Sequence, residues 1–399
     1  MDEFGFNDWP CFTSEEANLI SDVLLSNRVN YWTGEQIKNF EVEFADWVGT
    51  SYAIALMNGT VALDLALHCL GVGVGDEVIV TPRSFIASAS AVVNCGARPK
   101  FADVDKNSGN ITAETIQQNI SPQTKAIVCV HLAGWPCDME PILALAKKHD
   151  IAVIEDCAQA HGAKYKGKSV GSFGDVAAWS FCQDKIMTTG GEGGMVTCNN
   201  RKLWEKMWSY KDHGKAYQAV FNTKHPPGFR WLHESIGTNW RMTEIQAAIG
   251  RAQLVKMSQW KESRQKNALA IVEALKHFVW DQGAVRTPLP QIKDTDHAFY
   301  KYYIYADNNR LNSGWSRDRI LKELNSLGVP CLVGACPEIY NEKAFQNLGL
   351  APTRRLPGAQ KLGEEAIMFP VHPTITAKGI EFIIASLRQV FQAAAPMRT

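Results

Sequence analysis

The chain has 399 residues, of which 46% are hydrophobic and 21% are charged, and its formal net charge is zero. This length is too great for one simple hydrophobic core, so we expect two domains. No long basic or acidic run is present, which argues against nucleic acid or a membrane surface as a partner.

The N-terminus lacks a basic region followed by an apolar run, and no segment approaches the roughly 20 apolar residues of a membrane helix. The ten cysteines are scattered and form no metal-binding pattern. The sequence therefore predicts a reduced, cytoplasmic protein that needs no metal ion.

From about residue 50, short β-rich runs alternate with amphipathic helical patterns. We expect strands at 53–56, 78–81, 126–130 and 151–154, and helices at 60–70, 87–95 and 141–149. The strand runs are continuously apolar, which is typical of a mostly parallel sheet covered on both faces. In such sheets ligands bind at the carboxyl ends of the strands, where Asp156 and the turn before Thr60 fall.

The pattern changes in the C-terminal part of the chain. Residues 240–275 indicate one long or broken helix, and shorter elements follow: an aromatic strand at 299–305 and helices at 317–327 and 380–392. We expect residues 1–255 to form an N-terminal arm and a large domain, and residues 256–399 to form a small α+β domain. The N-terminal arm is expected to pack close to the small domain.

Residues 155–194 combine an acid after an apolar strand, a lysine in a later turn and a glycine-rich run. Taken singly, Asp156 could be a helix N-cap and Lys185 an ordinary surface lysine. Together they match what pyridoxal phosphate (PLP) requires: a lysine for the Schiff base and a carboxylate that keeps the pyridine nitrogen protonated. The segment predicts a PLP site with Lys185 as the catalytic lysine and Asp156 beside the ring nitrogen.

Five further residues are candidates for holding this cofactor. Gln159 follows Asp156 by three positions, so one helical turn would place it near the ring hydroxyl. Gly59 and Thr60 begin a helix directly after a strand, where free backbone N–H groups suit a phosphate, and Ser180 adds a hydroxyl. Phe85 is a candidate for stacking on the pyridine ring.

Glycines at 71, 73 and 75 resemble a dinucleotide-binding fingerprint. They follow a predicted helix rather than a strand, so we interpret them as a helix stop and a turn. This context argues against a nicotinamide-dependent oxidoreductase.

With these residues assembled, the chain resembles the DegT/DnrJ/EryC1/StrS family of PLP-dependent sugar aminotransferases over nearly its whole length. The resemblance rests on segments 58–60 with 62–63, 75–80, 131–134, 155–162, 180–181, 237–242 and 246–250, together with Phe85 and Lys185; the residues 182–184 before the lysine are less usual for the family. It implies the α/β fold of aspartate aminotransferase (fold type I): a large domain with a mostly parallel seven-stranded sheet, and a small α+β C-terminal domain.

The resemblance also implies a homodimer with shared active sites, in which Asn239 would reach the cofactor phosphate of the neighbouring subunit. The implied reaction moves an amino group from L-glutamate to a keto sugar of a nucleoside diphosphate, for amino sugars of polysaccharides or other glycans. Lys185 would hold PLP and move the proton in both halves of the reaction.

Finer substrate features follow from the same resemblance. The Thr188-Thr189-Gly190 segment is similar to members that aminate carbon 4 of the sugar, which favours a 4-keto substrate. Tyr31 lies in an N-terminal segment that resembles one near the sugar, and His213 and Arg230 lie in a stretch that often meets the substrate. An arginine there would suit a diphosphate.

Two other interpretations stay open. A PLP enzyme of the same fold could be a sugar dehydratase, in which histidine replaces the lysine, or an amino-acid-only transaminase; Lys185 favours transamination. A non-catalytic regulatory or binding homologue is the second alternative, although intact Lys185, Asp156 and Gln159 argue against it.

Overall fold

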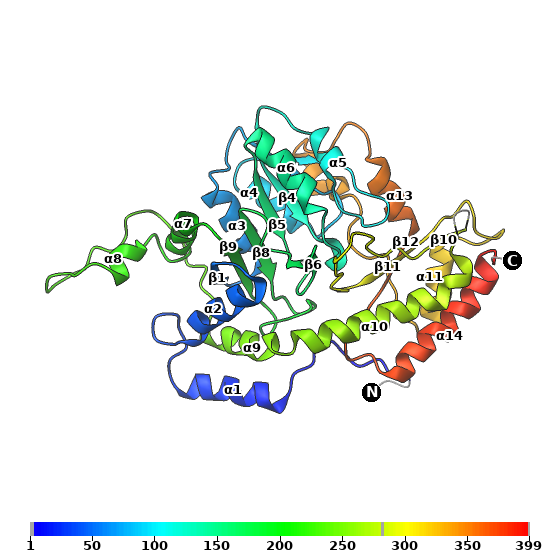
Figure 1. Cartoon of the computed structure of the whole chain (residues 1–399), viewed down its shortest axis with the longest axis horizontal. Helices are drawn as coiled ribbons and strands as arrows, with labels where there is room; N and C mark the ends of the chain where they lie inside the picture. The colour runs from blue at the N-terminus through cyan, green and yellow to red at the C-terminus, as the bar shows by residue number, and fades with distance from the viewer. Residues whose placement is uncertain (1–3, 281–282, 398–399) are drawn as a thin grey trace.

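A seven-stranded sheet forms the centre of the molecule (Figure 1). The computed structural model describes residues 4–280 and 283–397. The strand order is β1–β9–β8–β5–β4–β2–β3. The strands are β1 (Tyr52–Leu56), β2 (Glu77–Val80), β3 (Arg98–Phe101), β4 (Thr124–Val130), β5 (Ala152–Asp156), β8 (Val176–Ser180) and β9 (Gly194–Cys198). Only β9 runs antiparallel to its neighbours in this sheet. The mostly parallel seven-stranded sheet of the prediction is therefore confirmed.

Helices cover both faces of this sheet. They are α2 (Gln36–Val48), α3 (Gly59–Cys69), α4 (Ala87–Asn94), α5 (Ala113–Gln117), α6 (Met139–His149), α7 (Arg201–Lys211) and α9 (Glu244–Leu254). Neighbouring residues of one strand join different cores: Val128 packs with the α3 side and Ile127 with the α6 side. Burial on both faces explains why the strands are continuously apolar in the sequence.

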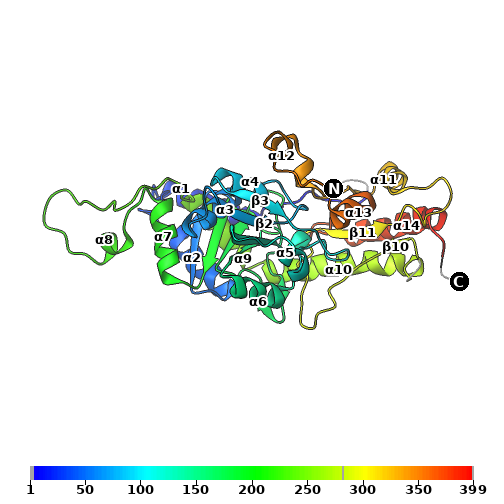
Figure 2. The same cartoon turned by 90° about the horizontal axis from the view of Figure 1, so that it is seen from above.

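A second, smaller sheet lies toward the end of the molecule that is opposite α8 (Figure 2). Its antiparallel strands are β10 (Val285–Arg286), β11 (Tyr302–Ala306) and β12 (Ala366–Phe369). The helices around it are α10 (Met257–Leu275), α11 (Arg317–Ser326), α12 (Lys343–Asn347), α13 (Pro357–Glu365) and α14 (Ala377–Ala394). A separate hydrophobic core joins α10, α14 and this sheet.

Two predicted elements are defined more closely by the structure. The pattern of 240–275, predicted as one long or broken helix, is broken into α9 and α10 at a turn in which Lys256 N–H donates to the Gln253 carbonyl at 2.9 Å. The aromatic strand begins at Tyr302 rather than at residue 299, because Phe299 has φ of 49°, which no strand residue adopts. The domain boundary near residue 255 stays a prediction.

The N-terminal segment packs against the end that holds the smaller sheet, as expected. Phe4 stacks on Phe382 of α14 at 4.5 Å between ring centroids, and Asn7 Nδ2 donates to the Thr374 carbonyl at 3.1 Å. The remaining short elements are α1 (Ser14–Leu25), α8 (Tyr217–Phe221), β6 (Lys164–Tyr165) and β7 (Lys168–Ser169). None of the helices in residues 4–280 and 283–397 has the length and apolar character needed to cross a membrane.

Candidate active site

A cavity of about 850 Å³ opens where the carboxyl ends of the parallel strands meet the smaller sheet. The structure brings seven of the eight predicted cofactor residues to its wall: Gly59, Thr60, Phe85, Asp156, Gln159, Ser180 and Lys185. These residues come from β5, β8, the start of α3 and the loops that follow the strands. The fold therefore assembles, at one sheet edge, side chains that are up to about 125 positions apart in the sequence.

Lys185 lies in the turn after β8 and is largely buried. Its Nζ is 3.7 Å from Asp184 Oδ1 and 5.1 Å from the centroid of the Tyr300 ring. The Lys185 carbonyl accepts a hydrogen bond from Trp9 Nε1 at 2.8 Å, so the N-terminal segment holds this turn in place. The amine thus faces the cavity from a fixed backbone, as a lysine that binds a cofactor covalently requires.

Asp156 ends β5 and is buried in the cavity wall. Its Oδ2 accepts from Ser88 Oγ at 2.7 Å, and its Oδ1 accepts from the Ala158 N–H at 3.1 Å. Burial raises the pKa of Asp156, although these two hydrogen bonds and the charge on Lys185 oppose the effect. Lys185 forms its ion pair with Asp184 rather than with Asp156. The Asp156 carboxylate therefore has no ion-pair partner among the described residues. A pyridinium N–H would supply one.

Gln159 lies in a turn rather than in the helical turn that the sequence suggested, since Ala160 N–H donates to the Cys157 carbonyl at 2.9 Å. Both Gln159 and Asp156 nevertheless line the cavity. Gln159 Oε1 accepts from the Ala133 N–H at 2.8 Å. This contact uses the amide oxygen and leaves the amide nitrogen as a donor toward a ligand.

The start of α3 is where the sequence predicts a phosphate-binding site. Asn58 caps the helix by accepting from Val61 N–H at 3.0 Å, and Gly59 and Thr60 are its first two residues, whose N–H groups have no intrahelical acceptor. A Cβ on Gly59 would lie 2.5 Å from Ser180 Cβ, so only glycine lets β8 approach this closely. Gly59, Thr60 and Ser180 line the same cavity, so the free N–H groups and the Ser180 hydroxyl lie beside one another, which suits an anion.

These observations fit PLP. The cavity offers a lysine amine, an unpaired buried carboxylate, an amide donor and a helix N-terminus that suits phosphate. Phe85 lines the cavity and is 66% exposed, so an aromatic face remains uncovered by this chain's own side chains. The lysine amine matches the cofactor's aldehyde, the carboxylate its ring nitrogen, the amide donor its ring hydroxyl, and the helix N-terminus its phosphate.

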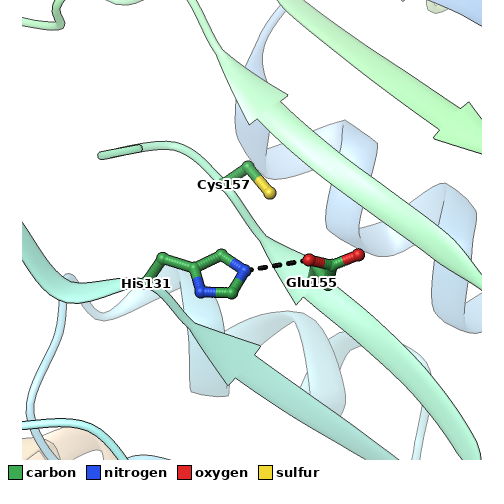
Figure 3. Close-up of side chains that lie close together, drawn as sticks. All are labelled: His131, Glu155 and Cys157. Carbon is green, nitrogen blue, oxygen red and sulfur yellow. Dashed lines mark hydrogen bonds and ion pairs between the residues drawn. The ribbon is translucent and has the colours of Figure 1, made fainter. Parts of the chain in front are cut away.

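Behind Asp156 lies a second buried carboxylate, Glu155, with His131 and Cys157 nearby (Figure 3). His131 Nε2 is 3.0 Å from Glu155 Oε2, and His131 Nδ1 accepts from the Cys137 N–H at 2.9 Å. Both ring nitrogens of His131 are therefore engaged, with the proton on Nε2.

Glu155 also accepts three backbone hydrogen bonds at 2.8 Å, from Gly171, Phe173 and Gly174. Burial alone would raise the pKa of Glu155, but His131 and these N–H groups outweigh it and hold the pKa below its usual value. The cluster is thus a satisfied hydrogen-bond network that fixes β5 and the loop at 171–174. We do not interpret it as a metal site.

Four predicted residues lie away from the cavity wall of their own chain. Asn239, His213 and Arg230 are exposed on or beside the segment 212–240, which projects from the body of the molecule around α8 (Figures 1 and 2). Tyr31 is 4% exposed, and its hydroxyl accepts from Trp208 Nε1 at 3.0 Å. The substrate roles of these residues stay predictions.

Sequence reasoning missed three groups beside Lys185 and Asp156. Ser88 donates to Asp156, the Tyr300 hydroxyl donates to Asp184, and Lys301 lines the cavity. A weak signal for Ser88 exists, since it follows Ser84 by four positions near the start of α4, and the two hydroxyl oxygens lie 3.0 Å apart. Tyr300 and Lys301 reach the site from a different sheet, and no local pattern indicates that contact.

Comparison with known proteins agrees with this geometry. Residues 10–388 match the model of the DegT/DnrJ/EryC1/StrS aminotransferase family. The chain is 39% identical over 360 residues to GDP-perosamine synthase of Caulobacter vibrioides, covering 90% of each chain. It is 35% identical to GDP-perosamine synthase of Escherichia coli O157:H7, covering 96% of this chain and 97% of the relative.

Among solved structures, an aminotransferase from Psychrobacter cryohalolentis is 58% identical, with a TM-score of 0.95 and coverage of 97% of this chain and 99% of that chain. The resemblance predicted from the sequence motifs is thereby confirmed, and so is the aspartate-aminotransferase-like fold type I. The chain is a transaminase and belongs to the DegT/DnrJ/EryC1/StrS aminotransferase family.

Proposed function

We propose that this transaminase uses PLP to move an amino group from L-glutamate to a keto sugar carried by a nucleoside diphosphate. The observation that carries the proposal is the meeting of Lys185, Asp156, Gln159 and the α3 N-terminus in one cavity. The relatives named as GDP-perosamine synthases support a nucleotide-sugar substrate. The product would serve amino-sugar synthesis for surface polysaccharides or glycans.

When bound, PLP supplies an aldehyde for the amino group and a protonated ring that withdraws electrons from the donor's α-carbon. Lys185 would hold the cofactor through Nζ, and its free amine would move the α-proton as a general base and acid. Asp156 would keep the ring nitrogen protonated, and Ser88 holds this carboxylate in place. Gln159 would donate to the ring hydroxyl oxygen, and Gly59, Thr60 and Ser180 would bind the phosphate.

The preference for a 4-keto sugar rests on the resemblance of the Thr188-Thr189-Gly190 segment. In this chain the segment is packed inside the protein: Thr188 Oγ1 donates to the Phe181 carbonyl at 2.9 Å, and Thr189 Oγ1 donates to the Glu192 carbonyl at 2.6 Å. Its effect on carbon 4 would therefore be exerted through the position of the Lys185 turn rather than by contact with the sugar.

We also propose a homodimer. The projecting segment 212–240 carries large apolar side chains that its own chain leaves uncovered: Phe229, Trp231 and Ile236 are 77%, 84% and 91% exposed. Such a patch on a projecting arm is typical of an interface. Docking on a second copy would give exposed Asn239 a route to that copy's phosphate cradle, and His213 and Arg230 a route to its substrate.

Dimer formation is tested by sedimentation of the wild type and of Trp231→Asp. We expect a dimer for the wild type and a shift toward monomer, with weaker PLP binding, for the variant. An unchanged dimer would remove the segment 212–240 from the interface. All ten cysteines are free, which agrees with a reducing, cytoplasmic setting for this assembly.

The reaction itself is tested with PLP, ¹⁵N-labelled L-glutamate and a panel of 3-keto and 4-keto nucleotide sugars. Mass spectrometry of the sugar products should show the label, and NMR should place it on carbon 4. Label on carbon 3 would support amination of a nucleotide sugar but would contradict the preference for carbon 4. Loss of water without label would indicate a dehydratase, and exchange only between amino acids and 2-oxo acids would indicate an amino-acid transaminase.

A further inference from the structure

A second lysine, Lys301, lines the same cavity as Lys185. It lies just before β11 on the smaller sheet, and its Nζ is 5.0 Å from the centroid of the Tyr300 ring. Lys185 Nζ is 5.1 Å from the same centroid. The two amines are therefore separated by at most about twice that distance. Unlike Lys185, Lys301 forms no hydrogen bond or ion pair with the described residues.

The backbone around Lys301 is held in an unfavourable conformation. Phe299 has φ of 49°, a value that bulky residues rarely adopt. Its N–H donates to His297 Nδ1 at 2.7 Å, and the Tyr300 N–H donates to the Ala133 carbonyl at 2.9 Å. Strain of this kind persists only where the surroundings enforce it, and it gathers at ligand sites. Here the kink is what directs Tyr300 toward Asp184 and leaves Lys301 at the cavity wall.

Three cations, Lys185, Lys301 and Arg264, lie close together beside Asp184, while the cavity wall as a whole also carries Asp156, Glu192 and Glu342. Arg264 is 1% exposed; its Nη1 donates to the Phe299 and Tyr300 carbonyls, and its Nε and Nη2 have no hydrogen-bond partner among the described residues. Asp184 is the acid that faces Lys301, and it already contacts Tyr300 and Lys185. Burial and the charges of Arg264 and Lys185 lower the pKa of Lys301 against the attraction of Asp184. An anionic ligand beside Lys301 would oppose this effect.

Lys301 lies within at most about 10 Å of Lys185 Nζ, so an anion bound beside the Lys185 amine is the first candidate for its ligand. The cofactor phosphate is accounted for at Gly59, Thr60 and Ser180. The amino nitrogen of an amino-acid donor must take the place of Lys185 Nζ, and its α-carboxylate oxygens lie only about 3–4 Å from that nitrogen. In a nucleotide sugar with its ketone at carbon 4, the diphosphate sits on carbon 1, across the sugar ring and farther from Lys185.

We propose that Lys301 binds the α-carboxylate of the amino-acid donor, an inference that rests on the proposed transaminase function. Through this ion pair, Lys301 would bind the amino-acid substrate in the first half of the reaction. The keto sugar, which carries no carboxylate at this point, would bind the same cavity through other contacts.

The test compares Lys301→Met, which keeps the length and removes the charge, with Lys301→Arg, which restores a cation. Lys276→Met, on an exposed lysine at the end of α10, is the matched control. The probes are 2-methyl-L-glutamate and 2-aminoisobutyrate, which have an α-carboxylate but no α-proton, and n-butylamine, which has no carboxylate. Binding to the PLP-loaded protein is followed by absorbance, without turnover.

We expect Lys301→Met to raise the Kd of both amino-acid probes about 10- to 150-fold, as for loss of a hydrogen bond between charged groups. The Kd of n-butylamine should stay unchanged, Lys301→Arg should restore most of the affinity, and Lys276→Met should match the wild type.

Three results would overturn the proposal: amino-acid affinity unchanged in Lys301→Met, an equal loss for n-butylamine, or a loss for 2-methyl-L-glutamate alone, which would assign Lys301 to the side-chain carboxylate. If Lys301→Met does not give the visible band of PLP, Lys301→Gln is measured against the same limits. Failure of the proposed function is distinct, since the wild type would then show no band with PLP or no response to glutamate.

Discussion

The two walls of the cavity differ in how they are built. The wall from the large sheet carries Asp156, Gln159 and Ser180, each held by hydrogen bonds from its own neighbourhood. The wall from the smaller sheet carries Tyr300 and Lys301, which a kinked backbone brings in from more than 100 residues away along the chain. The first wall holds the groups that we propose for the PLP chemistry, and the second holds Lys301, which forms no hydrogen bond or ion pair with the described residues.

We therefore assign the chemical step and cofactor binding to the large-sheet wall, and the choice of ligand to the small-sheet wall. Changes on the large-sheet wall should alter the chemical step or cofactor binding, whatever the substrate. Changes on the small-sheet wall should alter which ligand binds, as tested above for Lys301. Within the large-sheet wall, the adjacent carboxylates of Glu155 and Asp156 provide a sharper contrast, because one is satisfied by the protein and the other is not.

The largest effect is expected for Lys185→Ala. Loss of both covalent attachment and proton transfer should lower kcat by at least about 10⁴-fold. The variant should still bind PLP noncovalently, because Gly59, Thr60, Asp156 and Gln159 are untouched. The measurement is release of 2-oxoglutarate from glutamate, together with equilibrium dialysis of PLP. Retention of most of the activity would show that the catalytic lysine is another residue.

Asp156→Asn should lower kcat by about 10²- to 10³-fold, because an amide does not hold the ring nitrogen protonated. The PLP-free protein should unfold at an unchanged or higher temperature, since the variant removes a buried carboxylate with no ion-pair partner. Near-normal turnover would take Asp156 out of its proposed role. A large loss of thermal stability would show that the carboxylate supports the fold instead.

Glu155→Gln is the matched variant one residue earlier, and the opposite pattern is expected. One oxygen of Glu155 would become an NH₂ group facing N–H donors, so the free energy of unfolding should fall by about 3 kcal/mol. Chemical denaturation of the PLP-free protein measures this change. If Glu155→Gln and Asp156→Asn change stability alike, the contrast between the two carboxylates is wrong.

Gly59→Ala should destabilise the protein by about 1–3 kcal/mol and weaken PLP binding, because its Cβ would meet Ser180 Cβ at 2.5 Å. Gly73→Ala is the control, since the nearest heavy atom to its Cβ would be 3.8 Å away, and a change within about 0.5 kcal/mol is expected. Thermal unfolding and PLP titration measure both variants. Equal effects of the two variants would mean that the packing of α3 against β8 leaves room for a Cβ atom at residue 59.

The pH dependence of stability should give the smallest but most diagnostic differences. The folded pKa of Asp156 is raised, so its contribution is present at low pH and is lost as pH rises through that pKa. The folded pKa of Glu155 is lowered, so its contribution is present above the unfolded pKa and is lost as pH falls through the folded pKa.

From pH 4 to 7, Asp156→Asn should therefore gain stability relative to the wild type, and Glu155→Gln should lose it. Urea denaturation of the PLP-free proteins across this range checks the signs. Parallel curves for all three proteins would contradict the assigned pKa directions.

Most of the large sheet and its wall of the cavity could be predicted from the sequence. Buried parallel strands are continuously apolar, and Asp156 and Lys185 lie in short segments whose chemistry is local. The start of α3 was predicted because a glycine after a strand is a local signal for an anion site.

The small-sheet wall could not be predicted in the same way. Lys301 is one lysine in an aromatic strand pattern, and only the left-handed Phe299 and the contacts with Arg264 and Ala133 bring it to the cavity. Tyr31 is a second example: its motif suggested a substrate contact, which stays a prediction, and only the structure shows that its side chain contacts Trp208 and Lys211. Long-range packing decides both positions, and no periodicity encodes it.

The most direct test of the central claim is the visible absorption spectrum of the purified protein with added PLP, recorded before and after L-glutamate. We predict a yellow band that depends on Lys185 and bleaches on addition of glutamate, as the amino group passes to the cofactor. A protein that gives no band with PLP, or a band that glutamate leaves unchanged, would contradict the assignment of this cavity as a glutamate-dependent PLP site.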